Sequence, residues 1–316
     1  MRVVIAHNLS RSNQRDNMAY MDKKDLKIVF LGTPEFGVRP LEALIDAGYQ
    51  IIGVITAPDK AVGRKMILTP SPVKISAEKN KLPIYQPEDK TELLEIMKKL
   101  RPDLAIVAAF GMIFTKEILG IPKYGFLNIH ASLLPRWRGA SPIQSAILAG
   151  DQKTGITIML VNEKMDEGPI LAMREFPISV PTGHLPKGDN FPKLQEKLSE
   201  LGAELLLETI PKWVNGEIKP QEQDRSKATY CKKITKEDGM IDLDNESTEI
   251  IERKIRAFTP WPGAYVFIDG KRLIITKAEV KNNSLKIKQV KPEGKNEMDF
   301  ADYLRGNKNE SLKKFL

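Results

Sequence analysis

Three polar side chains near the middle of the chain have the types and spacing to stabilise an oxyanion and move a proton. Asn128 and His130 lie two positions apart at the end of the apolar stretch 125–130, and Asp166 follows in the glycine-containing turn 162–170. Side chains at positions i and i+2 of a strand share one face, so the amide and the imidazole should lie side by side. An amide can donate to a developing oxyanion, an imidazole can carry a proton, and a carboxylate can orient the imidazole.

A structural role for His130 is the alternative, because a histidine that ends an apolar strand can be a satisfied core residue. No nucleophile stands beside it: Ser132 is near, but it lacks the surrounding Gly-x-Ser-x-Gly pattern of a nucleophile elbow. If the three residues are catalytic, the group that they activate therefore belongs to a substrate.

The segments that must position these residues alternate between strand and helix patterns. Helical spacing occurs at 35–48, 90–100, 142–150 and 191–214, and buried strands are predicted at 26–32, 49–56, 103–110, 125–130 and 155–161. This alternation predicts an α/β fold, a doubly wound and mostly parallel Rossmann-like sheet. In such sheets ligands bind at the carboxyl ends of the strands, which is where Asn128 and His130 fall.

The turn after the first predicted strand argues against a nicotinamide-dependent dehydrogenase. Its sequence, GTPEFG at 32–37, lacks the Gly-x-Gly-x-x-Gly spacing that admits a dinucleotide pyrophosphate. The acidic residue that would bind a ribose is also not clearly placed, since Asp59 stands in the segment APDKAVGRK. A dinucleotide site is therefore disfavoured.

Composition excludes several other classes of protein. Cys231 is the single cysteine, which rules out an internal disulfide and a cysteine-based metal site. His7, His130 and His184 show no ligand-like spacing, so we expect no metal. No stretch approaches the roughly 18 apolar residues of a membrane span. We expect a cytoplasmic monomer that does not enter membranes.

The chain is long enough for two domains. We expect a disordered extension at 1–25, a catalytic domain at 26–213, a polar linker at 214–228 and a basic C-terminal domain at 229–316. Alternating apolar residues flank Asp269-Gly270, a strong signal for a tight hairpin. Together with the strand pattern at 284–290, this hairpin predicts a small OB-like β-barrel.

The net charge of +8 is carried by one stretch of the C-terminal domain. Between 253 and 291 only Asp269 and Glu279 oppose ten basic residues, which are Arg253, Lys254, Arg256, Lys271, Arg272, Lys277, Lys281, Lys286, Lys288 and Lys291. Such a stretch is either a solvated basic surface or a face that binds a polyanion such as nucleic acid.

Longer segments resemble a known enzyme family. GFLNIHASLLPRWRGASPIQ at 125–144 and TGITIMLVNEKMDEGPIL at 154–171 are similar to the signature of formyltransferases that use 10-formyltetrahydrofolate. Segments 27–44, 56–74 and 255–280 are similar to the branch of this family that formylates methionyl-initiator tRNA. The resemblance extends from Leu26 to Arg305.

The resemblance implies roles for individual residues. Asn128, His130 and Asp166 would be catalytic, acting on a tetrahedral oxyanion formed when the methionyl amine attacks the formyl carbon. The folate would be bound by Met112, Ile113, Ser132, Leu133, Leu134 and Pro135. The tRNA would be bound by Arg64, Lys65, Arg253, Lys254, Lys271 and Arg272.

The sequence departs from many relatives at three places. Pro169 stands where an aspartate is often found, the segment 180–194 is longer than usual, and the first 20 residues have no counterpart. None of these changes falls on Asn128, His130 or Asp166, but the role of the loop near His184 stays open.

Rival functions share part of the pattern. A formyltransferase acting on a small amine, such as glycinamide ribonucleotide or an aminosugar nucleotide, would need neither the linker nor the basic domain. A folate deformylase would use water as the acceptor, and an RNA-binding protein would carry a degenerate α/β domain. We interpret Trp137 as an anchor beneath a loop, with Arg136 and Arg138 at the surface.

Overall fold

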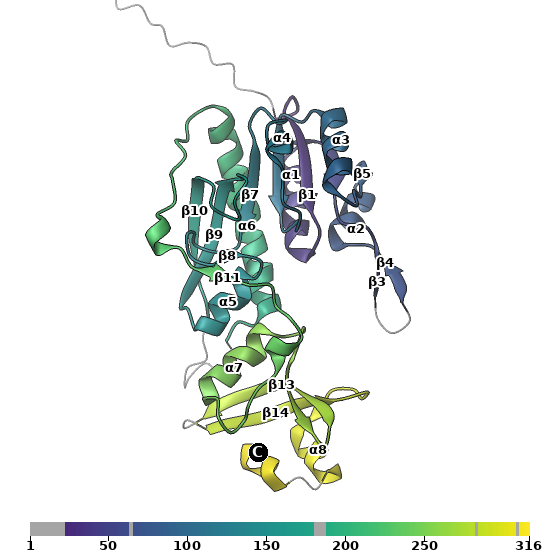
Figure 1. Cartoon of the computed structure of the whole chain (residues 1–316), viewed down its shortest axis with the longest axis vertical. Helices are drawn as coiled ribbons and strands as arrows, with labels where there is room; N and C mark the ends of the chain where they lie inside the picture. The colour runs from purple at the N-terminus through teal and green to yellow at the C-terminus, as the bar shows by residue number, and fades with distance from the viewer. Residues whose placement is uncertain (1–22, 63–65, 180–187, 282–283, 308–309) are drawn as a thin grey trace, which may run out of the picture.

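The computed structural model describes residues 23–62, 66–179, 188–281, 284–307 and 310–316. In Figure 1 a large sheet with its helices forms the upper part of the molecule, and a smaller sheet crosses the lower part. No helix within the described ranges is long and apolar enough to cross a membrane. Arg64, Lys65 and His184 lie outside the described residues.

The large sheet has seven strands in the order β10-β9-β7-β6-β1-β2-β5. Their bounds are β1 (Lys27–Gly32), β2 (Gln50–Ile55), β5 (Ile84–Tyr85), β6 (Leu104–Ala108), β7 (Phe126–His130), β9 (Lys153–Leu160) and β10 (Ile170–Pro177). Only β9 runs against the others, because it pairs antiparallel with both β7 and β10. The prediction of a mostly parallel sheet is confirmed.

Helices cover both faces of this sheet. Ile28 and Phe30 of β1 belong to one core cluster, while Val29 and Leu31 between them belong to another. The first cluster is shared with α1 (Val38–Asp46), α2 (Pro72–Lys79), α5 (Pro142–Ala149) and α6 (Phe191–Val214), and the second with α3 (Lys90–Leu100) and α4 (Lys116–Leu119). Alternate side chains of one strand therefore reach opposite layers, as a doubly wound sheet requires.

A small antiparallel strand pair that the sequence pattern did not predict follows β2. Its strands β3 (Lys60–Val62) and β4 (Ile67–Thr69) pair antiparallel and extend away from the sheet (Figure 1). Ile67 and Leu68 are more than half exposed, so this hairpin is not stabilised by a buried apolar face of β4. The absence of core periodicity explains why the sequence pattern did not reveal it.

The C-terminal part is an open antiparallel sheet in the order β12-β13-β14-β15. Its elements are α7 (Thr248–Ala257), β12 (Ala264–Ile268), β13 (Lys271–Lys281), β14 (Ser284–Pro292), β15 (Met298–Asp299) and α8 (Phe300–Gly306). Asp269 and Gly270 have φ of 49° and 74°, which confirms the predicted two-residue hairpin turn.

The predicted closed barrel is not confirmed. In the described residues β12 and β15 lie at opposite edges of the sheet, and β15 contains only two residues. Instead of closing, the sheet packs its inner face on α7 and α8, with Ile251, Phe300 and Leu304 in a core cluster of its own. Helices thus supply the burial that a barrel would obtain by closure.

The two parts are joined by packing as well as by the chain. Helix α7 packs on α5, and Arg253 of α7 donates to the carbonyl oxygen of Ala149 at 3.3 Å. The segment after residue 214 also returns to the large sheet, because Gln221 pairs with Ile170. Farther along, β11 (Tyr230–Cys231) pairs with β8 (Arg138–Gly139).

Candidate active site

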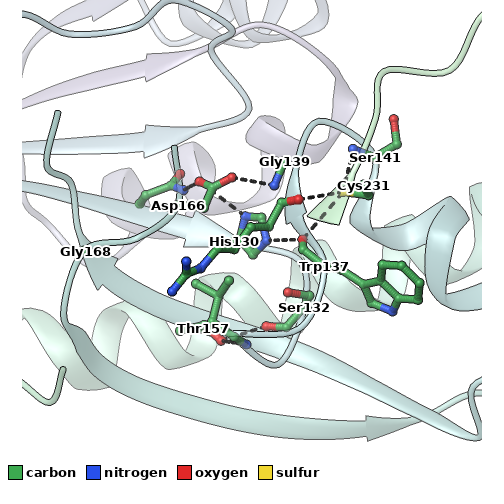
Figure 2. A network of polar contacts seen from close by, with 12 residues as sticks. His130, Ser132, Trp137, Gly139, Ser141, Thr157, Asp166, Gly168 and Cys231 are labelled. Carbon is green, nitrogen blue, oxygen red and sulfur yellow. Dashed lines mark hydrogen bonds and ion pairs between the residues drawn. The ribbon is translucent and has the colours of Figure 1, made fainter. Parts of the chain in front are cut away.

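Strand β7 places Asn128 and His130 on one face, and a loop from the neighbouring hairpin brings Asp166 to them. Because β9 is antiparallel to β7, its last residue Leu160 lies beside Leu127, near the start of β7. The loop 161–169 therefore has to fold back along the sheet. Figure 2 shows Asp166 directed toward His130. Asp166 Oδ1 lies 3.7 Å from His130 Nδ1 and 3.5 Å from Asn128 Nδ2.

Asp166 is oriented through a backbone contact that the sequence did not reveal. Its Oδ2 accepts a hydrogen bond of 2.8 Å from the backbone N–H of Gly139. Gly139 has a φ of 117°, and a Cβ at this position would lie 2.2 Å from the carbonyl oxygen of Cys231. Only glycine can therefore bring this N–H to the carboxylate. The only sequence signal for this contact was the glycine that ends the segment RWRG at 136–139.

His130 is almost fully buried, and its tautomer follows from its partners. Nε2 lies 3.0 Å from the carbonyl oxygen of Trp137, which can only accept, so Nε2 carries the proton and donates. In the neutral imidazole Nδ1 then has the lone pair. That atom faces the Asp166 carboxylate, which makes Nδ1 the position that can take up a proton.

The segment 132–135, which we expected to bind folate, is held by β9. Thr157 Oγ1 donates to the carbonyl oxygen of Ser132 at 2.7 Å and accepts from the N–H of Leu134 at 3.2 Å. The side chains of Ser132 and Leu134 are buried, and Ser132 Oγ donates to the carbonyl oxygen of Arg136. Leu133 and Pro135 are partly exposed.

Met112 and Ile113 lie in the loop after β6, the strand that pairs with β7. Ile113 is 57% exposed, whereas Met112 is partly buried against a core cluster. The structure thus places these two residues at the carboxyl end of the strand beside the catalytic candidates, with the side chain of Ile113 open to solvent.

The interpretation of Trp137 as an anchor agrees with the structure, but that of its two flanking arginines does so only for Arg136. Trp137 packs against the main core, and its indole N–H donates to Asp151, which also pairs with Arg136 at the surface. Arg138, however, is only 1% exposed, so its expected surface position is wrong. The chain returning from the linker covers it, since Tyr230 pairs with Arg138 in the β8–β11 ladder.

Cys231 has a structural environment. Its Sγ accepts from the N–H of Ser141 at 3.4 Å and donates to the carbonyl oxygen of Arg138 at 3.3 Å. Burial raises the pKa of this thiol, so it remains protonated at neutral pH. The residue therefore helps to close the loop around Gly139 as a neutral side chain.

The basic residues expected to bind tRNA differ in their contacts within the protein. Arg253 reaches Ala149, Lys254 pairs with Glu246, and Arg272 donates to the carbonyl oxygen of Pro262 while lying 3.8 Å from the Tyr265 ring centroid. Lys271 is exposed beside the hairpin turn. Three of these four side chains thus have contacts within the protein, and Lys271 presents its charge to solvent.

No cluster of three or more His, Cys, Asp or Glu side chains suited to a metal ion occurs in the part of the chain that the structure describes. The polar groups around His130 are instead an amide, a single carboxylate and backbone N–H and carbonyl groups. This donor set is suited to hydrogen bonding and proton transfer.

Comparison with known proteins shows the family to which this fold belongs. Residues 26–210 match the family model described as formyl transferase, and residues 233–284 match the formyl transferase C-terminal domain. The protein is therefore a formyl transferase by class.

Methionyl-tRNA formyltransferase from Chloroflexus aurantiacus is 46% identical over 257 residues, covering 81% of this chain and 80% of that protein. The enzyme of the same name from Bacillus subtilis is 41% identical over 307 residues, covering 89% and 94%. The chain belongs to the methionyl-tRNA formyltransferase family.

Solved structures share the fold at low sequence identity. HypX from Aquifex aeolicus in complex with tetrahydrofolic acid superposes with a TM-score of 0.63 and 18% identity, covering 90% of this chain and 47% of that one. Methionyl-tRNA formyltransferase from Clostridium thermocellum gives a TM-score of 0.55 at 19% identity, covering 84% and 98%.

Two threonines of β9 give a matched test of how segment 132–135 is held. Thr157→Val leaves the Ser132 carbonyl and the Leu134 N–H without their partner, so we expect the free energy of unfolding to fall by about 1–3 kcal/mol. Thr154 is also buried, but its hydroxyl has no hydrogen-bond partner among the described residues. Thr154→Val should therefore leave stability unchanged or raise it. Urea unfolding followed by circular dichroism measures both, and equal effects would contradict the assignment.

Proposed function

We propose that this protein transfers the formyl group of 10-formyltetrahydrofolate to the α-amino group of methionyl-initiator tRNA. The observation that carries the proposal is the convergence of Asn128, His130 and Asp166 at one edge of the sheet. There Asp166 lies within 3.7 Å of both other side chains. Membership of the methionyl-tRNA formyltransferase family supports the choice of acceptor.

Asn128 is suited to stabilise the oxyanion. The methionyl amine attacks the formyl carbon, and the carbonyl oxygen becomes an oxyanion as the new carbon–nitrogen bond forms. Asn128 is only partly buried, and one N–H of its amide faces Asp166 at a long distance, which leaves the second N–H for the oxyanion. One such donor is typically worth about 3–4 kcal/mol in the transition state.

His130 and Asp166 are suited to move the proton. The attacking amine must lose a proton, and the lone pair of His130 Nδ1 can accept it. The imidazolium that results lies beside the Asp166 carboxylate, whose charge stabilises it. Collapse of the oxyanion then breaks the bond to the folate nitrogen, which receives the proton from the His130 imidazolium, and tetrahydrofolate leaves.

For the formyl donor, we propose contacts with the loops that follow β6 and β7. Met112, Ile113, Leu133 and Pro135 keep exposed surface there, and we assign them the folate contacts through side chains. Ser132 and Leu134 are buried, so we assign them contacts through the backbone and a role in shaping the segment.

For the tRNA, we propose phosphate contacts from the basic sheet and from Arg64 and Lys65, which fall between β3 and β4 in the sequence. We assign Lys271 a direct contact with a tRNA phosphate, because its side chain is exposed. Because Arg253, Lys254 and Arg272 have intramolecular partners, we propose that they also organise this surface. Lys277 of β13 and Lys291 of β14 are exposed and extend it.

The assay that tests the function is direct. Purified protein, 10-formyltetrahydrofolate and methionyl-initiator tRNA should yield formylmethionyl-tRNA and tetrahydrofolate in equal amounts. Free methionine and small amines such as glycinamide ribonucleotide serve as alternative acceptors. Formylation of a small amine at a rate equal to that of the charged tRNA would overturn the proposed acceptor.

The charge of Asp166 should be essential for the chemical step. Asp166→Asn keeps the shape of the side chain but removes the negative charge beside His130, so we expect single-turnover formyl transfer to fall by roughly 10² to 10⁴. Glu163→Gln is the matched control, because it makes the same change at an exposed position of the same loop. Near-normal transfer by Asp166→Asn would refute the pairing of Asp166 with His130.

Lysines of the basic sheet should determine the salt dependence of tRNA binding. We expect Lys277→Gln with Lys291→Gln to weaken methionyl-tRNA binding and to reduce the slope of log affinity against log salt by roughly 0.7–0.9 for each phosphate that is no longer neutralised. Lys90→Gln with Lys99→Gln is the control, since α3 lies at the opposite end of the molecule (Figure 1). Equal slopes for both double variants would contradict the assignment.

A further inference from the structure

Gln223 lies in the segment 214–228, which its polar composition marked as a linker, yet its side chain is buried at 8% exposure. Its Nε2 donates to the carbonyl oxygen of Asp166 at 2.9 Å and to that of Gly168 at 2.7 Å. A side chain more than fifty residues away in the sequence thus binds the backbone on which the catalytic carboxylate stands.

The other end of the same amide is held by Arg138. Gln223 Oε1 accepts from Arg138 Nε at 3.0 Å and from Nη2 at 2.8 Å. Arginine can only donate and carbonyl oxygens can only accept, so these partners determine which way the amide faces. Arg138 itself is held by Glu167 at 3.5 Å and by the hydroxyl of Tyr230 at 3.3 Å.

The loop that Gln223 binds adopts a conformation that needs support. Asp166 has a φ of 52°, in the left-handed region that residues other than glycine seldom adopt, and such conformations persist where surrounding contacts impose them. Residues 162–165, which precede it, are exposed. On the other side, a Cβ at Gly168 would lie 1.7 Å from the carbonyl oxygen of Leu160. Gln223 thus contacts the loop from Asp166, which follows the exposed residues, to Gly168, which packs closely against Leu160.

We propose that Gln223 is a positioning residue for the formyl transfer reaction. By holding the carbonyl groups of Asp166 and Gly168, it keeps the Asp166 carboxylate at the distance from His130 and Asn128 that proton transfer requires. The inference rests on the proposed function, because it assigns Gln223 a part in that reaction through Asp166. It also makes the segment between the two sheets a component of the active site.

A role limited to satisfying Arg138 is the competing explanation, and one substitution separates the two. Gln223→Glu retains an oxygen for Arg138, so the buried guanidinium keeps its acceptor. The variant has no N–H for the loop and places a carboxylate oxygen against two carbonyl oxygens. The hydrogen bonds with Arg138 therefore survive, while those that hold the loop at Asp166 are broken.

Gln221→Glu is the matched control. It makes the same chemical change two residues earlier, where the side chain is exposed and only the backbone pairs with Ile170. We expect Gln223→Glu to lower kcat roughly 10- to 100-fold, the effect of a misplacement of about 1 Å, with the KM for methionyl-tRNA and for the formyl donor nearly unchanged. Gln221→Glu should match the parent protein in all three values.

A double-mutant cycle with Asp166→Asn gives the decisive readout. If Gln223 acts by placing the carboxylate, Gln223→Glu should reduce kcat far less once that charge is gone. An equal fold-reduction in both backgrounds would overturn the inference and leave the proposed function intact. Near-normal activity of Asp166→Asn alone would refute the role of Asp166 and with it the inference, again without touching the proposed acceptor. No formylation of methionyl-tRNA by the parent would instead refute the proposed function.

Folding is checked by thermal unfolding of each variant. Should Gln223→Glu not yield folded protein, Gln223→Asn takes its place in the cycle. The shorter amide keeps its polarity but is one methylene too short to join Arg138 to both carbonyl groups. Gln223→Asn should likewise reduce kcat far less in the Asp166→Asn background than in the parent. An equal fold-reduction in both backgrounds overturns the inference.

Discussion

The carboxylate of Asp166 is the group on which the arrangement of the candidate active site depends. It accepts from the N–H of Gly139 and faces both His130 and Asn128, so it joins the loop after β9, the turn before α5 and the end of β7. Each of these segments comes from a different part of the chain. A single acceptor can satisfy all of them only if the loop folds back along the sheet, which is possible because β9 runs against β7.

The turn at 137–139 has an equally central position, because its backbone contacts the candidate catalytic side chains and its own side chains contact neighbouring segments. The carbonyl of Trp137 determines which nitrogen of His130 carries a proton, and the N–H of Gly139 orients the carboxylate. The side chain of Arg138 contacts Gln223 and Tyr230. The site is therefore organised by the same segment that attaches the basic C-terminal part of the protein.

Segments with a strong local pattern were predicted well. The helix at 191–214 agrees with α6, the helix at 90–100 agrees with α3, and Asp269-Gly270 forms the expected turn, because apolar period and turn chemistry are local properties. The hairpin of β3 and β4 was missed because β4 buries no apolar face. The barrel was not confirmed, because α7 and α8 supply the burial of the sheet in the described residues. Local patterns do not specify which element covers a face.

The candidate site divides in the same way. The placement of Asn128 and His130 on one face follows from the two-residue period of a strand. The glycine-containing turn after the strand 155–161 indicated Asp166, and the resemblance to a known family indicated the reaction. Only the tertiary structure decided which atoms meet: the proton on His130 Nε2, the N–H of Gly139 on the carboxylate, and the burial of Arg138 against Gln223. The physical reason is that these contacts join backbone and side-chain groups from distant segments, and their distances depend on how the chain folds back rather than on any spacing along it.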